Sequence, residues 1–94
     1  MTSYEFEVAA KNAVIEVLEE YYDIMVSIKD LELVWFTHVV GNKKCLIYGH
    51  EMGKMYAEVT YLKESMTMYV DMYRKVQHEA FAGDRLAELT TALK

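Results

Sequence analysis

The chain contains no proline and a single cysteine, Cys45. One cysteine cannot form an internal disulfide, which argues against a stapled, secreted module and fits a reducing compartment. No apolar run approaches the roughly 20 residues that a membrane-spanning helix needs, and the first residues lack the basic segment of a secretory signal. These absences predict a cytoplasmic protein that is neither targeted nor anchored to a membrane.

Positive charge is also scarce. The chain has 10 Lys and Arg against 15 Asp and Glu, a net charge of -5, and a field of this sign repels phosphate backbones and favours basic partners. The two basic pairs, Lys43-Lys44 and Arg74-Lys75, are too few for a track along a nucleic-acid backbone. We therefore expect no direct binding of nucleic acid.

Nothing in the sequence divides the chain into domains, because it has no low-complexity segment, no repeat and no linker composition. A chain of 94 residues that is 53% apolar can build a core of its own, since a domain of this length buries roughly 60 to 70% of its unfolded surface. The prediction is one domain spanning residues 1–94.

The first element is an amphipathic helix. Between Phe6 and Tyr22 apolar residues recur at three- and four-residue spacing, the pattern of a helix with one buried face. Thr2 and Glu5 have the spacing of a capping box, so we expect the helix to begin near Ser3.

Three or four strands follow. Residues Leu31–Val40 are rich in β-branched and aromatic types, which favour strands. Gly41-Asn42 tolerates positive φ and is predicted to centre a hairpin with Lys43–Tyr48. Met55–Leu62 and a shorter segment, Met66–Val70, complete the predicted sheet.

The C-terminal part returns to helical spacing. After Asp71, a suitable N-cap, apolar residues recur as far as Phe81, and Gly83-Asp84 interrupts the pattern before Leu86, Leu89 and Leu93. The predicted fold class is α+β: an N-terminal helix, a three- or four-stranded antiparallel meander sheet, and a C-terminal helix or broken helix pair. In this arrangement the helices form one layer over one face of the sheet.

The side chains best suited to metal binding or catalysis are Cys45 and the three histidines, His38, His50 and His78. Their spacing matches no zinc site. If Gly41-Asn42 centres the hairpin, His38 lies directly opposite Cys45, which supplies two ligands at most, or a base beside a nucleophile.

The remaining catalytic signatures are missing. No nucleophile stands in a glycine-flanked elbow, and the four glycines form no phosphate loop. We therefore expect no metal, no cofactor and no enzymatic activity. The alternative left open is a small hydrolase or metal protein that uses Cys45 and His38.

Acidic residues gather on the first helix. Glu16, Glu19, Glu20 and Asp23 recur on the side opposite its apolar stripe, so they form an acidic ridge about 10 Å long at 1.5 Å per residue. Such a ridge is usually a solvated helix face. The sharper hypothesis is that it attracts a basic groove on a partner protein, because like charges on one surface steer association with the opposite charge.

The first two predicted strands are apolar on both faces, and one helical layer covers only one of them. Either a second layer or a partner must cover the other face. The hairpin register puts Trp35 and Tyr48 on the face that we expect the helices to cover. The opposite face, which carries Phe36 and Ile47, is then the predicted interface with a second copy or another protein.

From about Leu31 to Val76 the sequence resembles a family of small proteins of unknown function encoded by tailed phages and prophages of Gram-positive bacteria. The matching positions are Val34-Trp35, Asn42, Lys44, Leu46, Gly53, Tyr56, Glu58-Val59-Thr60-Tyr61, Tyr69-Val70-Asp71, Tyr73 and Lys75. They cover about half of the chain and contain no chemically diagnostic motif.

The resemblance implies a phage origin and nothing about catalysis. Small, acidic phage proteins are often inhibitors of a host enzyme or a defence nuclease, so it implies a non-enzymatic, anti-CRISPR-like antagonist of a host or defence protein, one that could hold a basic nucleic-acid groove. The alternative is a self-associating phage accessory or structural protein, a homodimer without a host target.

Overall fold

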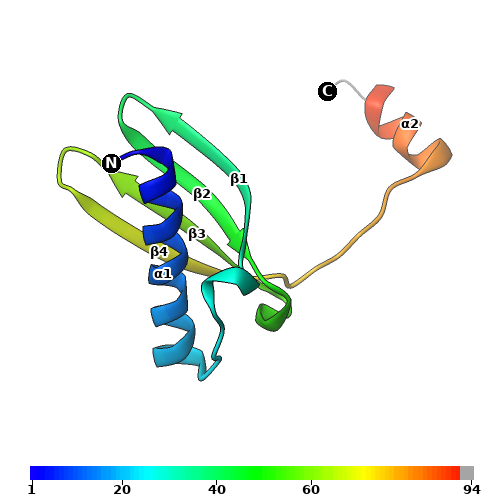
Figure 1. Ribbon diagram of the computed structural model, residues 1–94. Helices are drawn as coiled ribbons and strands as arrows, with labels where there is room; N and C mark the ends of the chain where they lie inside the picture. Colours follow the sequence, from blue (N-terminus) through cyan, green and yellow to red (C-terminus); the bar gives the residue numbers. More distant parts are fainter. Residues whose placement is uncertain (92–94) are drawn as a thin grey trace.

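A computed structural model describes residues 1–91 of the chain. The element order is α1 (Ser3–Tyr22), η1 (Ile28–Asp30), β1 (Glu32–Val39), β2 (Asn42–Tyr48), η2 (His50–Met52), β3 (Met55–Leu62), β4 (Thr67–Arg74) and α2 (Gly83–Thr91). The four strands pair antiparallel in the order β1-β2-β3-β4, and α1 lies across one face of the sheet (Figure 1). The predicted α+β class with a meander sheet is confirmed.

The helix α1 begins as its sequence predicts. Thr2 is the N-cap: its hydroxyl accepts the Glu5 N–H at 3.0 Å, and the Glu5 carboxylate accepts the Thr2 N–H at 2.7 Å. These reciprocal bonds satisfy donors that the first turn of a helix leaves unpaired. The helix ends at Asp23, whose φ of 55° places it in the left-handed region.

The core lies between α1 and the sheet. Four residues of α1 at four-residue spacing, Phe6, Ala10, Val14 and Leu18, are fully buried. They pack on alternate residues of the two central strands, with Leu31 and Met52 closing one end. The strand residues in this core are Cys45, Ile47, Met55, Ala57, Val59 and Tyr61.

The β1–β2 turn lies one residue earlier than predicted. Val39 pairs with Asn42, so Val40 and Gly41 form the two-residue turn, both with positive φ (49° and 86°). Asn42 instead accepts the Lys63 N–H on its side-chain oxygen at 2.9 Å, tying this hairpin to the β3–β4 turn. The sequence favoured Gly41-Asn42 because asparagine tolerates positive φ, whereas the structure uses a β-branched residue there.

The fourth strand is longer than predicted, and the prediction of a helix directly after Asp71 is wrong. The segment from Asp71 to Arg74 continues β4, because Met72 packs against the core while Tyr73 stacks on Tyr56 of β3, with ring centroids 5.4 Å apart. Period-two contacts with β3 therefore override the three- and four-residue spacing seen in the sequence.

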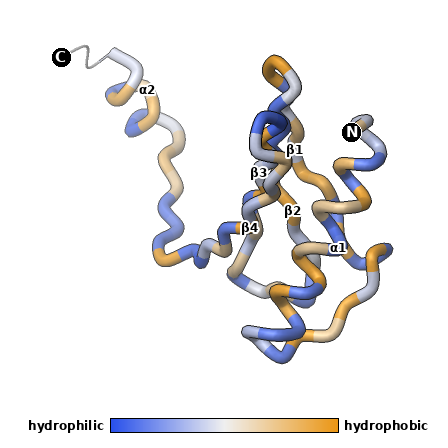
Figure 2. The backbone as a smooth tube through the Cα atoms, turned by 90° about the vertical axis from the view of Figure 1, so that its left-hand side faces the viewer, coloured by the Kyte–Doolittle hydropathy of each residue, from blue (hydrophilic) through white to orange (hydrophobic). Residues whose placement is uncertain are grey.

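The C-terminal arm, residues 75–91, does not join the helical layer that the sequence predicted. Residues 75–82 have no regular structure, and α2 has no buried residue. In Figures 1 and 2 α2 stands apart from the helix–sheet body. Leu93, which the sequence placed in the second helix, lies outside the described residues. Only α1 therefore covers the sheet within the part of the chain that the structure describes.

The turn geometry generates a stability prediction. Val40 is 89% exposed and holds φ at 49°, a conformation that costs a residue with a Cβ about 1 to 2 kcal/mol. Val40→Asn should stabilise the protein by about 1 kcal/mol, because Asn-Gly suits this hairpin turn. Urea denaturation measures the change. Val39→Asn, one residue away in the strand, is the control and should be neutral or destabilising; a loss of stability in Val40→Asn would contradict the turn assignment.

Candidate binding surfaces

The histidine and cysteine considered for catalysis do not meet. In the observed register His38 pairs with Lys43, and Cys45 pairs with Phe36. The His38 ring is exposed and its Nε2 accepts the Gly41 N–H at 3.1 Å. The prediction that His38 lies opposite Cys45 is therefore wrong, because it followed from the misplaced turn.

Cys45 has the environment of a core residue. Its side chain is fully buried. Burial, followed by the negative charge of Glu7, raises the pKa of the Cys45 thiol from 9.0 to about 11. A nucleophilic cysteine needs the opposite shift, toward the thiolate. Cys45 therefore contributes packing, and its pKa does not suit nucleophilic chemistry.

Metal-ligand side chains do not gather into a site in the described part of the chain. Within residues 1–91, no group of three or more His, Cys, Asp and Glu side chains is placed to hold a metal ion. The structure also has no described helix that is long and apolar enough to cross a membrane.

The open face of the sheet, the side that points away from α1, has no covering layer within residues 1–91 (Figure 2). Figure 2, turned by 90°, shows α1 on one side of the sheet and no helix against the other. Six exposed apolar or aromatic side chains of the strands belong to it. They are Val34 (56% exposed), Trp35 (40%), Val39 (61%), Leu62 (38%), Tyr69 (50%) and Tyr73 (42%).

Two charged residues of neighbouring strands form an ion pair near the centre of the open face. Lys44 of β2 and Glu58 of β3 form an ion pair at 3.0 Å, with Lys44 opposite Thr60 and Glu58 opposite Leu46. The pair is partly exposed, so it adds little stability. It does orient two charged groups between the aromatic residues of β4 and the apolar residues of β1.

A groove of about 460 Å³ lies at one end of the open face. A β-bulge between Leu33 and Trp35 brings Val34 to its wall. The Tyr48 hydroxyl, which donates to the Gly53 carbonyl at 2.9 Å, fixes the opposite side. The other lining residues are Leu46, Lys54, Met55, Tyr56 and Lys75. The groove is thus apolar with a basic rim.

The prediction of which face is covered is wrong. Trp35 and Tyr48 do share a face, but it is the open one. Ile47 is fully buried under α1, and Phe36 packs on Phe6 with ring centroids 5.6 Å apart. Ile47 therefore cannot contact a partner of the folded protein, and Phe36 is a half-exposed residue at the margin of the core.

The sequence contained a signal for the correct assignment. Polar residues alternate along the third strand, where Glu58 and Thr60 interrupt an otherwise apolar segment. Such alternation marks the solvent face of a strand, and Lys44 marks the same face of β2. Sequence reasoning missed Tyr56, Leu62, Tyr69 and Tyr73 as surface candidates because it weighed only the first two strands, which are apolar on both faces.

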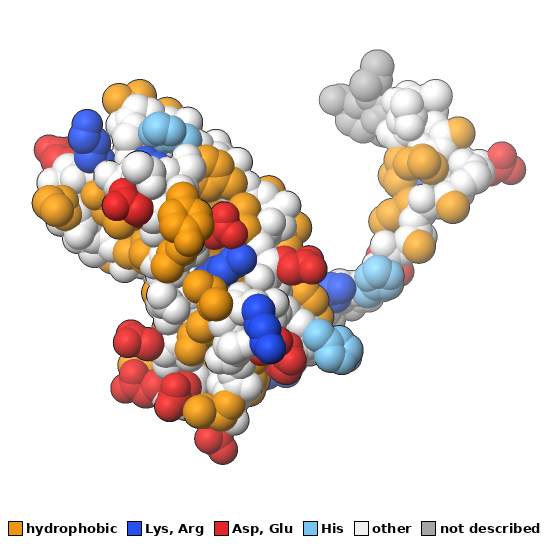
Figure 3. Space-filling model, in the orientation of Figure 1, with side chains coloured by type: hydrophobic (Ala, Val, Ile, Leu, Met, Phe, Trp, Pro, Cys, Tyr) orange, Lys and Arg blue, Asp and Glu red, His pale blue; other side chains and the backbone are white. Residues whose placement is uncertain are grey.

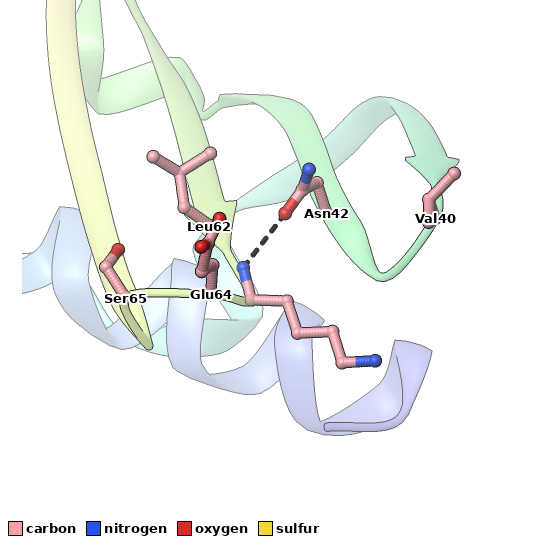
Figure 4. A pocket seen from close by; sticks show the side chains of 6 residues that line it. Val40, Asn42, Leu62, Glu64 and Ser65 are labelled. Carbon is pink, nitrogen blue, oxygen red and sulfur yellow. Dashed lines mark hydrogen bonds between the residues drawn. The ribbon is translucent and has the colours of Figure 1, made fainter.

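A second hollow separates the two hairpin turns. It measures about 850 Å³ and is lined by Val40, Asn42, Leu62, Lys63, Glu64 and Ser65. Figure 4 shows these side chains spread around the turns, with the Asn42 bond to the Lys63 backbone as a dashed line. Glu64 and Ser65 are exposed side chains of the turn, so this hollow is a gap between two loops and has no convergent polar groups.

The acidic ridge is exposed where the sequence predicted. Glu16, Glu19, Glu20 and Asp23 all face solvent at the C-terminal half of α1 (Figure 3). The last turn of α1 contains no basic residue, and within residues 1–91 none of the four forms an ion pair. Acidic groups near the negative end of a helix dipole are unfavourable by a few tenths to about 1 kcal/mol each.

Comparison with known proteins finds one family. The family model described as "Family of unknown function (DUF6275)" matches residues 7–83, most of α1, the whole sheet and the segment after β4. Most of α2 lies beyond the matched residues. Neither the curated proteins nor the solved structures include a significant match.

The Cys45 environment predicts low thiol reactivity. A pKa of about 11 in place of 9.0 lowers the thiolate fraction at pH 8 about 100-fold, and burial blocks access as well. An aromatic disulfide reagent should therefore react with the native protein at least about 100-fold more slowly than with urea-unfolded protein. His38→Ala should not change the native rate. Rapid native labelling that His38→Ala slows would instead restore the catalytic pair.

Proposed function

The chain belongs to the DUF6275 family, whose function is unknown, and we propose that it is a non-enzymatic protein-binding module that contacts its partner through the open face of its sheet. The observation that carries this proposal is the row of exposed apolar and aromatic side chains on a face without a covering layer. Tyrosine and tryptophan are enriched in protein interfaces, and large apolar side chains that gather on one exposed face mark interaction sites.

The groove beside Val34 is the proposed anchor point. Hot spots of protein interfaces lie in pockets where an apolar or aromatic side chain is fully desolvated. The groove supplies an apolar wall from Val34 and Leu46, and Lys54 and Lys75 stand at its rim. An aromatic or aliphatic side chain of the partner, flanked by an acidic residue, has the matching chemistry.

The class of partner that we propose is a host or defence protein, which the chain would inhibit in the manner of an anti-CRISPR protein. Two observations support this: the resemblance to phage proteins across the sheet and the exposed acidic ridge on α1. Glu16, Glu19 and Glu20 line one shallow depression with the sign of charge that a basic nucleic-acid groove attracts. In this proposal the open face supplies affinity and the ridge supplies steering.

A second candidate function is self-association, and the C-terminal arm favours it. A nine-residue helix is shorter than the roughly 12 to 15 residues at which isolated helices become marginally stable. Leu86 and Leu89 of α2 are 52% and 43% exposed, as is Phe81 at 51%. The α2 helix of one copy laid on the open face of another would cover both surfaces in a closed homodimer.

The open-face proposal predicts that replacing valine with aspartate weakens binding at one position and leaves it unchanged at another. Val34→Asp puts a charge at the groove wall and should weaken partner capture at least about tenfold, because an unpaired carboxylate would be desolvated in the interface. Val40→Asp, at the 89% exposed turn position, is the control and should bind normally. Capture from a lysate of a Gram-positive bacterium, quantified by mass spectrometry, provides the measurement.

Light scattering on the same three proteins separates the two candidate functions. A monomeric wild type that captures a host protein supports the inhibitor. A wild-type dimer that Val34→Asp dissociates supports self-association through the open face. Equal capture and equal mass for all three proteins would contradict both uses of this face.

The acidic ridge predicts salt-dependent association. Replacing Glu16, Glu19, Glu20 and Asp23 with glutamine or asparagine should slow association with the partner by about tenfold or more at low salt, because exposed charges act over roughly 8 Å at physiological ionic strength. The same variant should be slightly more stable than the wild type, since it relieves the helix dipole. Surface plasmon resonance at two salt concentrations tests the rate. An unchanged association rate would remove the ridge from the proposal.

A further inference from the structure

A cavity on the side of the sheet that faces α1 is lined by several basic groups. It measures about 360 Å³ and lies where the β1–β2 turn meets the start of the chain before α1. Its lining residues are Met1, His38, Gly41, Lys43, Tyr61 and Lys63. Three of these side chains carry basic nitrogen atoms and none carries a carboxylate.

Lys43 is the central group of this cavity. Lys43 lies on the same inward face of β2 as Cys45 and Ile47, and only 6% of the residue is exposed. Within residues 1–91 its ammonium group makes no hydrogen bond or ion pair, whereas the next residue, Lys44, pairs with Glu58 at 3.0 Å. The stem of Lys43 is therefore covered while its ammonium group faces the cavity without a protein partner among the described residues, and an anion in the cavity would pair with it.

The flanking strands and turn bring the other two basic side chains to the same place. His38 and Tyr61 are the register partners of Lys43 on either side. His38 Nε2 accepts the Gly41 N–H at 3.1 Å, which leaves Nδ1 as the donor of the neutral ring. Lys63 comes from the β3–β4 turn, and its backbone is held by the 2.9 Å bond to Asn42.

Gly41 is needed for this arrangement. A Cβ at Gly41 would lie 2.4 Å from Cδ of Lys63, so the missing side chain lets the Lys63 stem cross the turn. The φ of Gly41 is also positive, at 86°. The turn thus has a steric reason and a conformational reason for glycine, and the first of them positions a lysine of the cavity.

The start of α1 adds to the positive potential. The N-terminal end of a helix carries a partial positive charge, and Met1, which lines the cavity, directly precedes the Thr2 cap. The first carboxylate of α1, Glu5, is used in the capping box, where hydrogen bonds from Thr2 lower its pKa, and Glu64, which follows Lys63, lines the hollow between the hairpin turns. Glu5 is not among the residues that line the cavity.

We propose that this cavity binds a phosphate group, held by Lys43 and Lys63 with His38 as a further donor. Lysines recognise phosphate as point charges, and two of them match an anion that is close to doubly charged at neutral pH. A volume of about 360 Å³ is at the lower end of the range for small-molecule sites, enough for a phosphate with a small organic remainder. This site lies opposite the open face and is independent of the protein-binding proposal.

The test uses the full chain and inorganic phosphate. Thermal unfolding is followed in increasing phosphate, with chloride added to keep the ionic strength constant. The expected result is a saturable rise in Tm, because a ligand that binds only the folded state stabilises it by mass action. Lys43→Met, which keeps the stem and removes the charge, should lower the phosphate affinity at least about tenfold. Without phosphate it should melt at or above the wild-type temperature.

Two further variants keep the test decisive. Lys63→Met changes an exposed residue and should also weaken phosphate binding, even if Lys43→Met does not fold. Lys29→Met removes an exposed lysine of η1, away from the cavity, and should respond to phosphate like the wild type. No saturable shift in the wild type, or an equal loss in Lys29→Met, would overturn the site.

Comparing inorganic phosphate with ribose 5-phosphate identifies the source of the group. If ribose 5-phosphate binds at least tenfold more tightly than inorganic phosphate, and Lys43→Met loses this binding, the ligand is a phosphomonoester. Equal affinities that are both lost in Lys43→Met indicate free phosphate. Unchanged binding of both compounds by Lys43→Met and Lys63→Met would show that neither lysine contacts the anion.

Discussion

The packing of one helical stripe on one face of the sheet determines the rest of this structure. Phe6, Ala10, Val14 and Leu18 repeat every four residues and are fully buried, so α1 presents one continuous stripe to the inward residues of the sheet. Since a buried aliphatic side chain contributes roughly 1.5 to 3 kcal/mol, this contact and its partners in β2 and β3 supply most of the stability. Every other surface is defined by its position relative to α1.

The covering of one face by a single helix leaves the sheet asymmetric. In β2 and β3 inward residues are fully or almost fully buried, and three outward residues near the middle of the face, Lys44, Glu58 and Thr60, are polar. The outer strands do not follow this rule, because Val34, Trp35, Val39, Tyr69 and Tyr73 remain exposed on the open face. The centre of that face is thus suited to solvent while its margins are suited to a partner. A non-obligate interface is about as apolar overall as the rest of a protein surface, so the polar centre leaves the margins available for binding.

Local sequence patterns predicted the elements well and their relations less well. The α1 start at Thr2–Glu5 and the bounds of β3 follow from capping chemistry and alternation, both of which act over a few residues. The predicted hairpin turn lay one residue too late, because Val40 adopts a backbone conformation that its β-branched side chain disfavours. Moving the turn by one residue shifts the cross-strand partners near it by two, so Lys43 and not Cys45 lies opposite His38, while these residues keep their face of the sheet.

The covered face and the fourth strand could not be predicted for a different reason. Which side of a sheet a helix covers depends on contacts among distant segments, and here the residues of β3 decide it, with Ala57 and Val59 inward. Asp71 suits an N-cap as well as a strand, and only its neighbour Met72, held against the core, selects the strand. After Arg74 the predicted helix forms only over Gly83–Thr91, a segment that has no buried residue and does not pack on the sheet.

The C-terminal half of α1 carries charge of the sign that the helix dipole disfavours. Acidic side chains gather at the C-terminal half, where the helix dipole is negative, and the basic cavity of Lys43 and Lys63 lies by the start, where it is positive. In a domain of marginal stability, about 5 to 15 kcal/mol in total, such placement is a cost without a structural return. A basic group bound at the ridge and a phosphate bound in the cavity would each relieve the potential at its own end. The two proposals therefore have a common physical basis: charges of one sign gather at the ridge and in the cavity, and each group would be paired by the opposite charge.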